Sequence, residues 1–306
     1  MKKKTFLLFS ILSITLFSEA QNTTLCRYKD LVFPYITIDK NLSYAPVASQ
    51  NEGKGNLFDL YQPKGDSSTS RPLIIWMHGG GFIFGSKEAE GITIWSKSFA
   101  QRGYVCAAIN YSLAKNNAIF HLGKLQKNCY YAVQDAKTAV EYFRQHHAEF
   151  HIDPHKIILA GNSAGGLIAL QAAYSTDREL AKAAGLNDIE TKHQGTIKVA
   201  GVINFWGGIL DLNWLKNARV PIVSELGSDD KIVSPTHKNM TLYGGVDINE
   251  KANSLGIPSA LKVFDGYSHE LQRHFNPFFS GGTNTQKRWL EAGQFAADFL
   301  YPLLFK

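Results

Sequence analysis

Short apolar runs alternate along this chain with longer stretches in which apolar residues recur at helical spacing. Eight of the runs are rich in β-branched and aromatic residues, and several are almost entirely apolar. Continuous apolar runs of this length are typical of parallel strands that are buried on both faces. The predicted strands are residues 32–38, 57–61, 73–77, 104–110, 156–160, 199–205, 221–226 and 260–264.

Helical periodicity fills most of the intervals between these strands. The predicted helices are residues 94–101, 128–146, 164–174, 249–255 and 285–300. Strands that alternate with helices predict an α/β fold, here a mostly parallel, doubly wound, eight-stranded sheet flanked by helices. The interval 175–197 is too short for a large cap domain, and the polar stretch 64–71 is expected to be a hairpin-type connection.

The first twenty residues have the composition of a secretory signal peptide. Three lysines at positions 2–4 precede an apolar stretch, and the small residues Ser18 and Ala20 occupy the positions that a signal peptidase reads. The apolar stretch is shorter than the roughly 20 residues of a transmembrane helix. Cleavage is therefore expected after Ala20, leaving residues 21–306 as a single α/β domain that is secreted or periplasmic and has no membrane anchor.

Charge and cysteine content argue against nucleic-acid binding and against a zinc site. The formal net charge of +6 falls to +4 without residues 1–20, because three lysines and one glutamate are lost, and the remaining charges are dispersed. Nucleic-acid binding is therefore not expected. Cys106 lies inside a predicted strand and is expected to be buried, whereas Cys26 and Cys129 are available to pair in an oxidising compartment. Three scattered cysteines do not make a zinc site.

A serine with the surroundings of a nucleophile follows the fifth predicted strand. Ser163 is the centre of the pentapeptide G-N-S-A-G, between the apolar run 157–160 and the predicted helix 164–174. A G-x-S-x-G segment at a strand-to-helix turn lifts the hydroxyl clear of the sheet. The same pentapeptide also fits a tight turn whose serine only satisfies a backbone group, so the hypothesis depends on partner residues elsewhere.

A run of three glycines supplies the first of those partners. His78 follows the third predicted strand, and Gly79, Gly80 and Gly81 come directly after it, so that backbone N–H groups are free of side-chain obstruction. We assign the N–H groups of Gly80, Gly81 and Ala164 to an oxyanion hole. A phosphate-binding loop would end in G-K-[ST] or would open a helix with G-x-G-x-x-G, and neither pattern occurs here. His78 is expected to shape the glycine loop rather than to act as a base.

An acid and a histidine follow later strands in the required order. The strand 221–226 leads to Asp229 and Asp230, and the spacing G-x-x-D-x-x-V favours Asp230 as the acid. Asp229, Asp211 and Glu225 remain alternatives. The last strand leads to His269, the expected general base, which takes the proton of Ser163 while Asp230 fixes its tautomer.

These motifs together resemble the α/β-hydrolase-fold carboxylesterases and lipases of the HGGG type, which include hormone-sensitive-lipase-like and secreted bacterial esterases. The resemblance extends from about Cys26 to the C-terminus and is strongest in the segment R-P-L-I-I-W-M-H-G-G-G-F, residues 71–82. It implies a structural role for Asp135. One departure is Leu226, which stands where the family often has His before the glycine of the acid loop.

The resemblance implies a secreted serine carboxylesterase that needs no metal or organic cofactor. Phe82, Trp206 and Tyr267 are expected to line its substrate pocket, and short-chain or polysaccharide-linked (acetyl or feruloyl) esters are the expected substrates. Two alternatives stay open. The same catalytic residues cleave amide bonds in serine amidases and peptidases, and a hydrolase fold without activity can serve as a binding protein.

Overall fold

The computed structural model describes residues 25–45, 55–114, 122–186, 195–237, 241–277 and 282–306. The expected signal peptide and its cleavage site lie outside the described residues. Within the described part of the chain, no helix is both long enough and apolar enough to cross a membrane.

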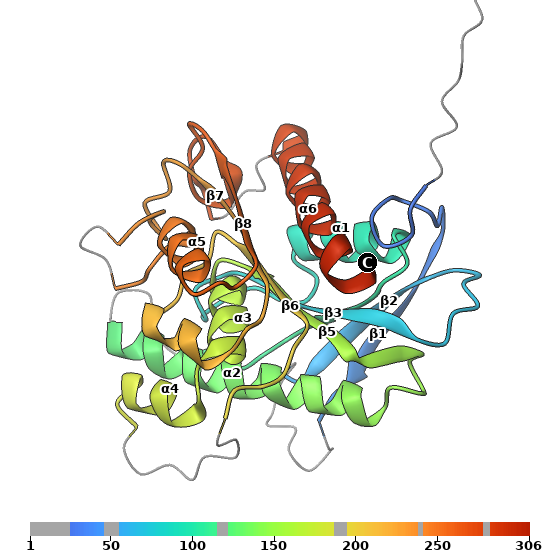
Figure 1. Cartoon of the computed structure of the whole chain (residues 1–306), viewed down its shortest axis with the longest axis horizontal. Helices are drawn as coiled ribbons and strands as arrows, with labels where there is room; N and C mark the ends of the chain where they lie inside the picture. The colour runs from blue at the N-terminus through green and yellow to red at the C-terminus, as the bar shows by residue number, and fades with distance from the viewer. Residues whose placement is uncertain (1–24, 46–54, 115–121, 187–194, 238–240, 278–281) are drawn as a thin grey trace, which may run out of the picture.

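A twisted sheet of eight strands runs through the centre of the molecule (Figure 1). Its spatial order is β1-β2-β4-β3-β5-β6-β7-β8. The six strands from β4 to β8 in this order are parallel, and β2 pairs antiparallel with both β4 and β1. This arrangement confirms the predicted fold class. The strands are β1 (Ile36–Ser43), β2 (Leu57–Pro63), β3 (Arg71–Met77), β4 (Val105–Ile109), β5 (Ile152–Asn162), β6 (Gly201–Phe205), β7 (Ile222–Gly227) and β8 (Ser259–Phe264).

Helices cover both faces of the sheet, as Figure 1 shows. The helices α1 (Glu90–Gln101) and α6 (Gly282–Phe305) pack against each other on one face. The opposite face carries α2 (Leu122–Gln145), α3 (Ala164–Tyr174) and α5 (Gly245–Ser254), with the short α4 (Asp177–Ala183) packed against α2. Two 3-10 turns, η2 (Leu212–Asn217) and η3 (His269–Leu271), complete the described elements.

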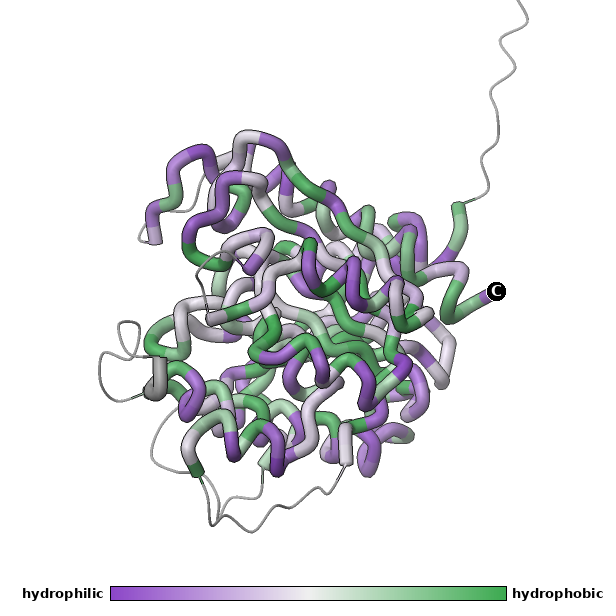
Figure 2. Tube along the Cα trace, turned by 60° about the vertical axis from the view of Figure 1, so that its left-hand side comes forward, coloured by the Kyte–Doolittle hydropathy of each residue, from purple (hydrophilic) through white to green (hydrophobic). Residues whose placement is uncertain are grey.

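Alternate residues of the central strands belong to two separate cores. In β3, Leu73, Ile75 and Met77 face the α2–α3 side, whereas Ile74 and Trp76 face the α1–α6 side. Because both sheet faces are covered by helices, these strands are apolar at every position rather than at every second one. Figure 2 shows the hydrophobic segments running through the middle of the molecule. Cys106 lies in β4 and is buried, as predicted.

The structure differs from the sequence predictions at a connection, at the start of a strand and at a helix that was not predicted. The stretch 64–71 is not a hairpin, because β2 pairs with β4 and the chain passes over β4 to reach β3. The strand expected at 32–38 begins instead at Ile36. Helix α4 was not predicted, although Thr176 and Glu179 form a capping box at its start.

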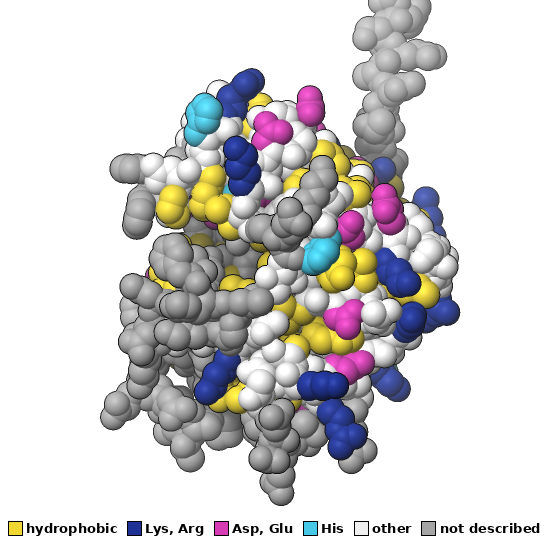
Figure 3. All heavy atoms as spheres, turned by 90° about the vertical axis from the view of Figure 1, so that its left-hand side faces the viewer, with side chains coloured by type: hydrophobic (Ala, Val, Ile, Leu, Met, Phe, Trp, Pro, Cys, Tyr) yellow, Lys and Arg dark blue, Asp and Glu magenta, His cyan; other side chains and the backbone are white. Residues whose placement is uncertain are grey.

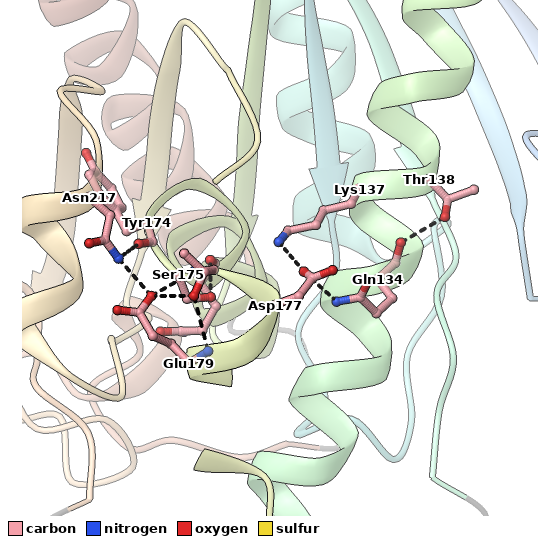
Figure 4. A network of polar contacts seen from close by, with 10 residues as sticks. Gln134, Lys137, Thr138, Tyr174, Ser175, Asp177, Glu179 and Asn217 are labelled. Atoms are coloured by element: carbon pink, nitrogen blue, oxygen red, sulfur yellow. Dashed lines mark hydrogen bonds and ion pairs between the residues drawn. The ribbon is translucent and has the colours of Figure 1, made fainter. Parts of the chain in front are cut away.

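A buried ion pair joins α2 to α4 on the face away from α6 (Figure 4). Lys137 Nζ lies 2.6 Å from Asp177 Oδ1, and both side chains are fully buried. The amide of Gln134 also donates to Asp177 Oδ1, at 3.1 Å. An ionised pair is tolerated in such a place only when its remaining hydrogen-bonding capacity is satisfied.

The cysteines are all free thiols. Cys129 is buried in α2, and Cys26 lies in the N-terminal segment, where its N–H donates to Asp30. The pairing of Cys26 with Cys129 that the sequence left open is therefore not formed in this structure. The surface carries both signs of charge: on the face shown in Figure 3, basic and acidic side chains are interspersed.

Candidate active site

Ser163 occupies a sharp turn between β5 and α3. Its backbone has φ 53° and ψ −117°, a left-handed conformation that is unfavourable for a residue with a Cβ. The turn is held from the neighbouring strand, because Ser163 N–H donates to Phe205 O at 2.9 Å. The helix starts at once, with Leu167 N–H donating to Ser163 O. The strand-to-helix turn expected from the pentapeptide is present.

Close packing explains why glycine must flank this serine. A Cβ added to Gly165 would lie 1.9 Å from Met77 O and 2.6 Å from Met77 C. The absence of a side chain lets the first turn of α3 approach the end of β3. The strained turn of Ser163 and the close approach of helix to sheet are thus encoded together.

His269 and Asp230 meet Ser163 in one hydrogen-bonded chain. Ser163 Oγ–H donates to His269 Nε2 at 2.8 Å, and His269 Nδ1–H donates to Asp230 Oδ2 at 2.7 Å. The two loops that carry them follow β8 and β7, at the same edge of the parallel sheet as the end of β5. His269 and Asp230 are almost fully buried, so this chain of hydrogen bonds is shielded from water.

The structure places Asp230, and none of the alternative acids, on the histidine. The second carboxylate oxygen of Asp230 accepts from the N–H groups of Ile232 and Val233, at 2.8 and 3.0 Å, which orients the carboxylate. Asp229 instead accepts from the hydroxyl of Ser228. Of the other two alternatives, Asp211 caps η2, and Glu225 is buried within β7.

The glycine loop presents free N–H groups beside the nucleophile. Gly80 and Gly81 have φ values of 109° and 61°, which only glycine adopts readily. The N–H groups of Gly80, Gly81 and Ala164 donate to no other group in the described part of the chain. The loop is tied to the serine turn through Asn162, whose Oδ1 accepts from Gly79 N–H at 3.1 Å.

His78 supports this loop from behind. Its ring is buried and stacks on Tyr111 with a centroid separation of 4.3 Å. Nδ1–H donates to Gly79 O at 2.6 Å, and the hydroxyl of Tyr111 donates to His78 O at 2.7 Å. Burial lowers the pKa of His78 to about 4, so the imidazole is neutral at physiological pH. These contacts agree with a loop-shaping role.

The expected pocket residues are mostly core residues. Phe82 and Trp206 are 0% and 1% exposed, and Trp206 packs on Trp95 and Phe205. Neither side chain presents a free surface to a ligand in this structure. Tyr267 is half-buried, and the guanidinium of Arg288 lies 4.1 Å from its ring centroid.

A cavity of about 970 Å³ opens beside the acid and histidine loops. Its lining includes Asp230, Arg273 and Phe275, and none of the three expected pocket residues. Phe275 also packs its ring edge-on against His269, with centroids 4.9 Å apart. No sequence motif indicated Phe275, because its contact with His269 depends on the fold of the histidine loop.

This arrangement supplies the parts needed for nucleophilic catalysis. His269 can accept the proton of Ser163, and the carboxylate of Asp230 faces the charge that would then develop on the imidazole. Asp135, for which the resemblance implied a structural role, accepts from Ser112 N–H at 2.7 Å.

Comparisons with known proteins find similarity to proteins named as ester hydrolases. The sequence profile of the BD-FAE family matches residues 58–247. The Mycobacterium tuberculosis protein named "Probable carboxylic ester hydrolase LipM" is 26% identical over 206 residues, which are 67% of this chain and 42% of that protein. Human arylacetamide deacetylase-like 2 is 29% identical over 143 residues, or 46% of this chain and 31% of that protein. The matches thus span less than half the length of these relatives.

Solved structures share the fold at low sequence identity. Thermogutta terrifontis esterase 2 phosphorylated by paraoxon has a TM-score of 0.63 and 23% identity, covering 89% of this chain and 96% of that one. The same esterase with bound propionate has a TM-score of 0.61 and 22% identity, covering 87% and 94%. Since the profile match covers more than half of the sequence, the chain belongs to the BD-FAE family of α/β-hydrolase carboxylesterases.

Proposed function

We propose that this protein is a serine carboxylic-ester hydrolase with Ser163 as nucleophile, His269 as general base and Asp230 as the orienting acid. The observation that carries the proposal is the buried chain of hydrogen bonds from Ser163 Oγ through His269 to Asp230. The relatives named as ester hydrolases and esterases support the same chemistry.

Acylation follows from this geometry. Ser163 Oγ attacks the carbonyl carbon of the ester while its proton moves to His269 Nε2. Asp230 stabilises the imidazolium through the Nδ1–H hydrogen bond. The negative charge on the former carbonyl oxygen is met by the N–H groups of Gly80, Gly81 and Ala164, and loss of one such donor typically costs about 10²–10³ in rate.

The intermediate then collapses and water completes the cycle. The bond from the carbonyl carbon to the alcohol oxygen breaks, and the alcohol leaves with the proton held on His269. A water molecule gives a proton to the same Nε2 and attacks the acyl-enzyme. Cleavage of the ester bond to Ser163 returns that proton to Oγ and releases the carboxylic acid.

We propose short-chain or polysaccharide-linked acyl groups, acetyl or feruloyl, as substrates. The related esterase 2 has been solved with bound propionate and with bound butyrate, both short-chain acids. The stretch between α3 and β6 contributes only the seven-residue α4 to the described structure, which leaves little material for a lid. A panel of acetyl, butyryl, octanoyl and feruloyl esters, with acetylated xylan, tests the preference; highest kcat/KM on the octanoyl ester would contradict it.

The catalytic assignment is tested by Ser163→Ala. We expect at least a 10³-fold loss of kcat on p-nitrophenyl acetate and complete loss of the covalent adduct that paraoxon forms with the wild type. Ser254→Ala, which changes an exposed serine on α5, is the matched control and should keep full activity. An inactive binding protein would form no adduct, and an amidase would form the adduct yet turn over anilides faster than esters.

Export is the second part of the proposal. The lysines at positions 2–4, the apolar stretch and the small residues before position 21 support a cleaved signal peptide. The N-terminus of the protein recovered from the culture medium or periplasm should be Gln21 by mass spectrometry. An N-terminus that retains residues 1–20 would refute cleavage.

A further inference from the structure

The backbone directly after His269 is held in an unfavourable conformation. Glu270 has φ 56° and ψ 22°, and Leu271 has φ 55°, so two consecutive residues with a Cβ are left-handed. Side-chain crowding makes this conformation costly for each of them. Because His269 precedes these residues, whatever holds them also fixes the direction of the imidazole.

Helix α6 donates a side-chain hydrogen bond to each of the two strained residues. Trp289 Nε1–H donates to Glu270 O at 2.8 Å, and Arg288 Nε–H donates to Leu271 O at 2.8 Å. The donors are adjacent in the helix, and the acceptors are adjacent in the loop. The peptide groups that join Glu270 to Leu271 and Leu271 to Gln272 are therefore both held by hydrogen bonds from α6.

Trp289 is itself fixed within the α1–α6 core. It is 4% exposed, and its backbone oxygen accepts from Trp95 Nε1–H at 2.8 Å. Trp95 is fully buried and stacks on Trp76 of β3, with centroids 5.6 Å apart. A continuous path of buried contacts thus connects β3, α1 and α6 to the histidine loop, with the last two links made by indole N–H groups.

The histidine loop needs such support because of its position. It follows β8, which is the last strand of the described sheet and pairs only with β7. Ser163 and Trp206 are held by N–H groups that donate to the neighbouring strand, whereas beyond β8 the described sheet has no further strand to serve the histidine loop. Helix α6 takes over that function.

We propose that Trp289 and Arg288 are positioning residues that hold His269 in line with Ser163. This inference rests on the proposed catalytic roles of Ser163 and His269. The two α6 residues touch neither Ser163 nor Asp230 through a hydrogen bond and act on His269 only through the backbone of the loop. Their loss should impair proton transfer while leaving the binding of the ester unchanged.

Two single substitutions remove the hydrogen bonds and keep most of the packing. Trp289→Phe deletes the indole N–H but retains an aromatic ring, and Arg288→Lys retains the charge but loses the Nε donor. Trp214→Phe, in a buried tryptophan on the opposite core, and Arg144→Lys, on α2, are the matched controls. All rates are divided by the concentration of sites titrated with paraoxon, so that an unfolded fraction does not count.

We expect each α6 variant to lose about tenfold or more in kcat with KM within twofold of the wild type, since a small misplacement of a catalytic group is costly. The loss should be larger on an alkyl acetate than on p-nitrophenyl acetate, because an alkoxide must be protonated by His269 as it leaves, whereas p-nitrophenolate leaves without help. Both control variants should match the wild type.

Two results overturn the inference. One is a kcat within twofold of the wild type for both α6 variants. The other is a loss of equal size on both esters together with an equal loss in the matched controls, which is the behaviour of general destabilisation. Failure of the proposed function looks different: the wild type itself would then show no turnover that depends on Ser163.

Discussion

Glu225 is a fully buried carboxyl group that forms no ion pair with any side chain in the described part of the chain. It lies in β7, and neither of its carboxyl oxygens has a hydrogen-bond partner in the described structure. Lys262, its neighbour on β8, turns its ammonium group to Glu291 on α6, at 2.6 Å. Burial raises the pKa of Glu225 well above the usual 4.5, with Lys262 opposing and Glu291 adding to the shift.

A raised pKa makes the stability of the protein fall as the pH rises. Below about pH 4.5, Glu225 is protonated in both the folded and the unfolded chain, so its ionisation does not change the free energy of unfolding. Above that pH, the unfolded chain gains free energy by ionising, whereas the folded chain keeps the proton, until the pH reaches the folded pKa. The free energy of unfolding therefore drops by about 1.4 kcal/mol per pH unit across this interval.

Glu225→Gln removes this dependence while keeping the size of the side chain. For a domain of this length, about 1.4 kcal/mol corresponds to roughly 2 °C in Tm. The Tm of the variant minus that of the wild type should therefore increase by about 2 °C per pH unit above pH 5. Glu270, whose pKa is also raised by burial, is the same in both proteins and cancels from the difference.

Thermal unfolding followed by circular dichroism between pH 4.5 and 8 measures the effect. Glu250→Gln, at an exposed position on α5, is the control and should give a difference that does not change with pH. Parallel Tm curves for the wild type and Glu225→Gln would refute the reasoning, because they would mean that Glu225 ionises equally in the folded and unfolded chains.

Two further predictions concern the buried ion pair between α2 and α4 and the close packing beside Ser163. Asp177→Ala leaves Lys137 buried without its partner and should cost about 3–5 kcal/mol in urea unfolding, whereas the double variant Asp177→Leu, Lys137→Met should cost clearly less; a larger loss in the double variant contradicts this. Gly165→Ala places a Cβ against Met77 O and should displace the serine turn, so that folded protein no longer reacts with paraoxon at Ser163. A folded variant that is labelled as fast as the wild type would show that the serine turn tolerates the displacement.

The sequence predicted the strands well where burial is two-sided and poorly where it is not. All six parallel strands were predicted within a few residues, and five of them, β3 to β7, contain the continuous buried runs that explain why; β8, at the edge, is mostly half-buried. The edge strand β1 leaves most of its side chains exposed or half-buried, so its apolar pattern is weak, and Val32 and Phe33 before it bind Gln101 O instead. The capping box of α4 was visible in the sequence, but seven mostly polar residues gave no periodicity to go with it.

The site shows the same division between local and distant signals. Ser163, the glycine loop and His269 each follow a predicted strand, so sequence order alone was enough to propose them. The choice of Asp230 over Asp229 depends on the turn that aims one carboxylate at His269, which spacing only indicated. Trp289 had no local signal, because it meets the histidine loop only when α6 folds back onto the sheet.

Backbone strain is concentrated where the proposed chemistry takes place. Nine described residues other than glycine have a positive φ, and five of them lie in loops at the carboxyl ends of β3, β5, β6 and β8: Phe82, Ser163, Trp206, Glu270 and Leu271. Each costs about 1–3 kcal/mol and persists only if its surroundings hold it. Ser163 and Trp206 are held by hydrogen bonds to the next strand, at 2.9 and 2.6 Å, and Glu270 by α6. Because the turns at Ser163, Trp206 and Glu270 are held by three different elements, β6, β7 and α6, the geometry around Ser163 depends on the neighbouring strands and on α6 together.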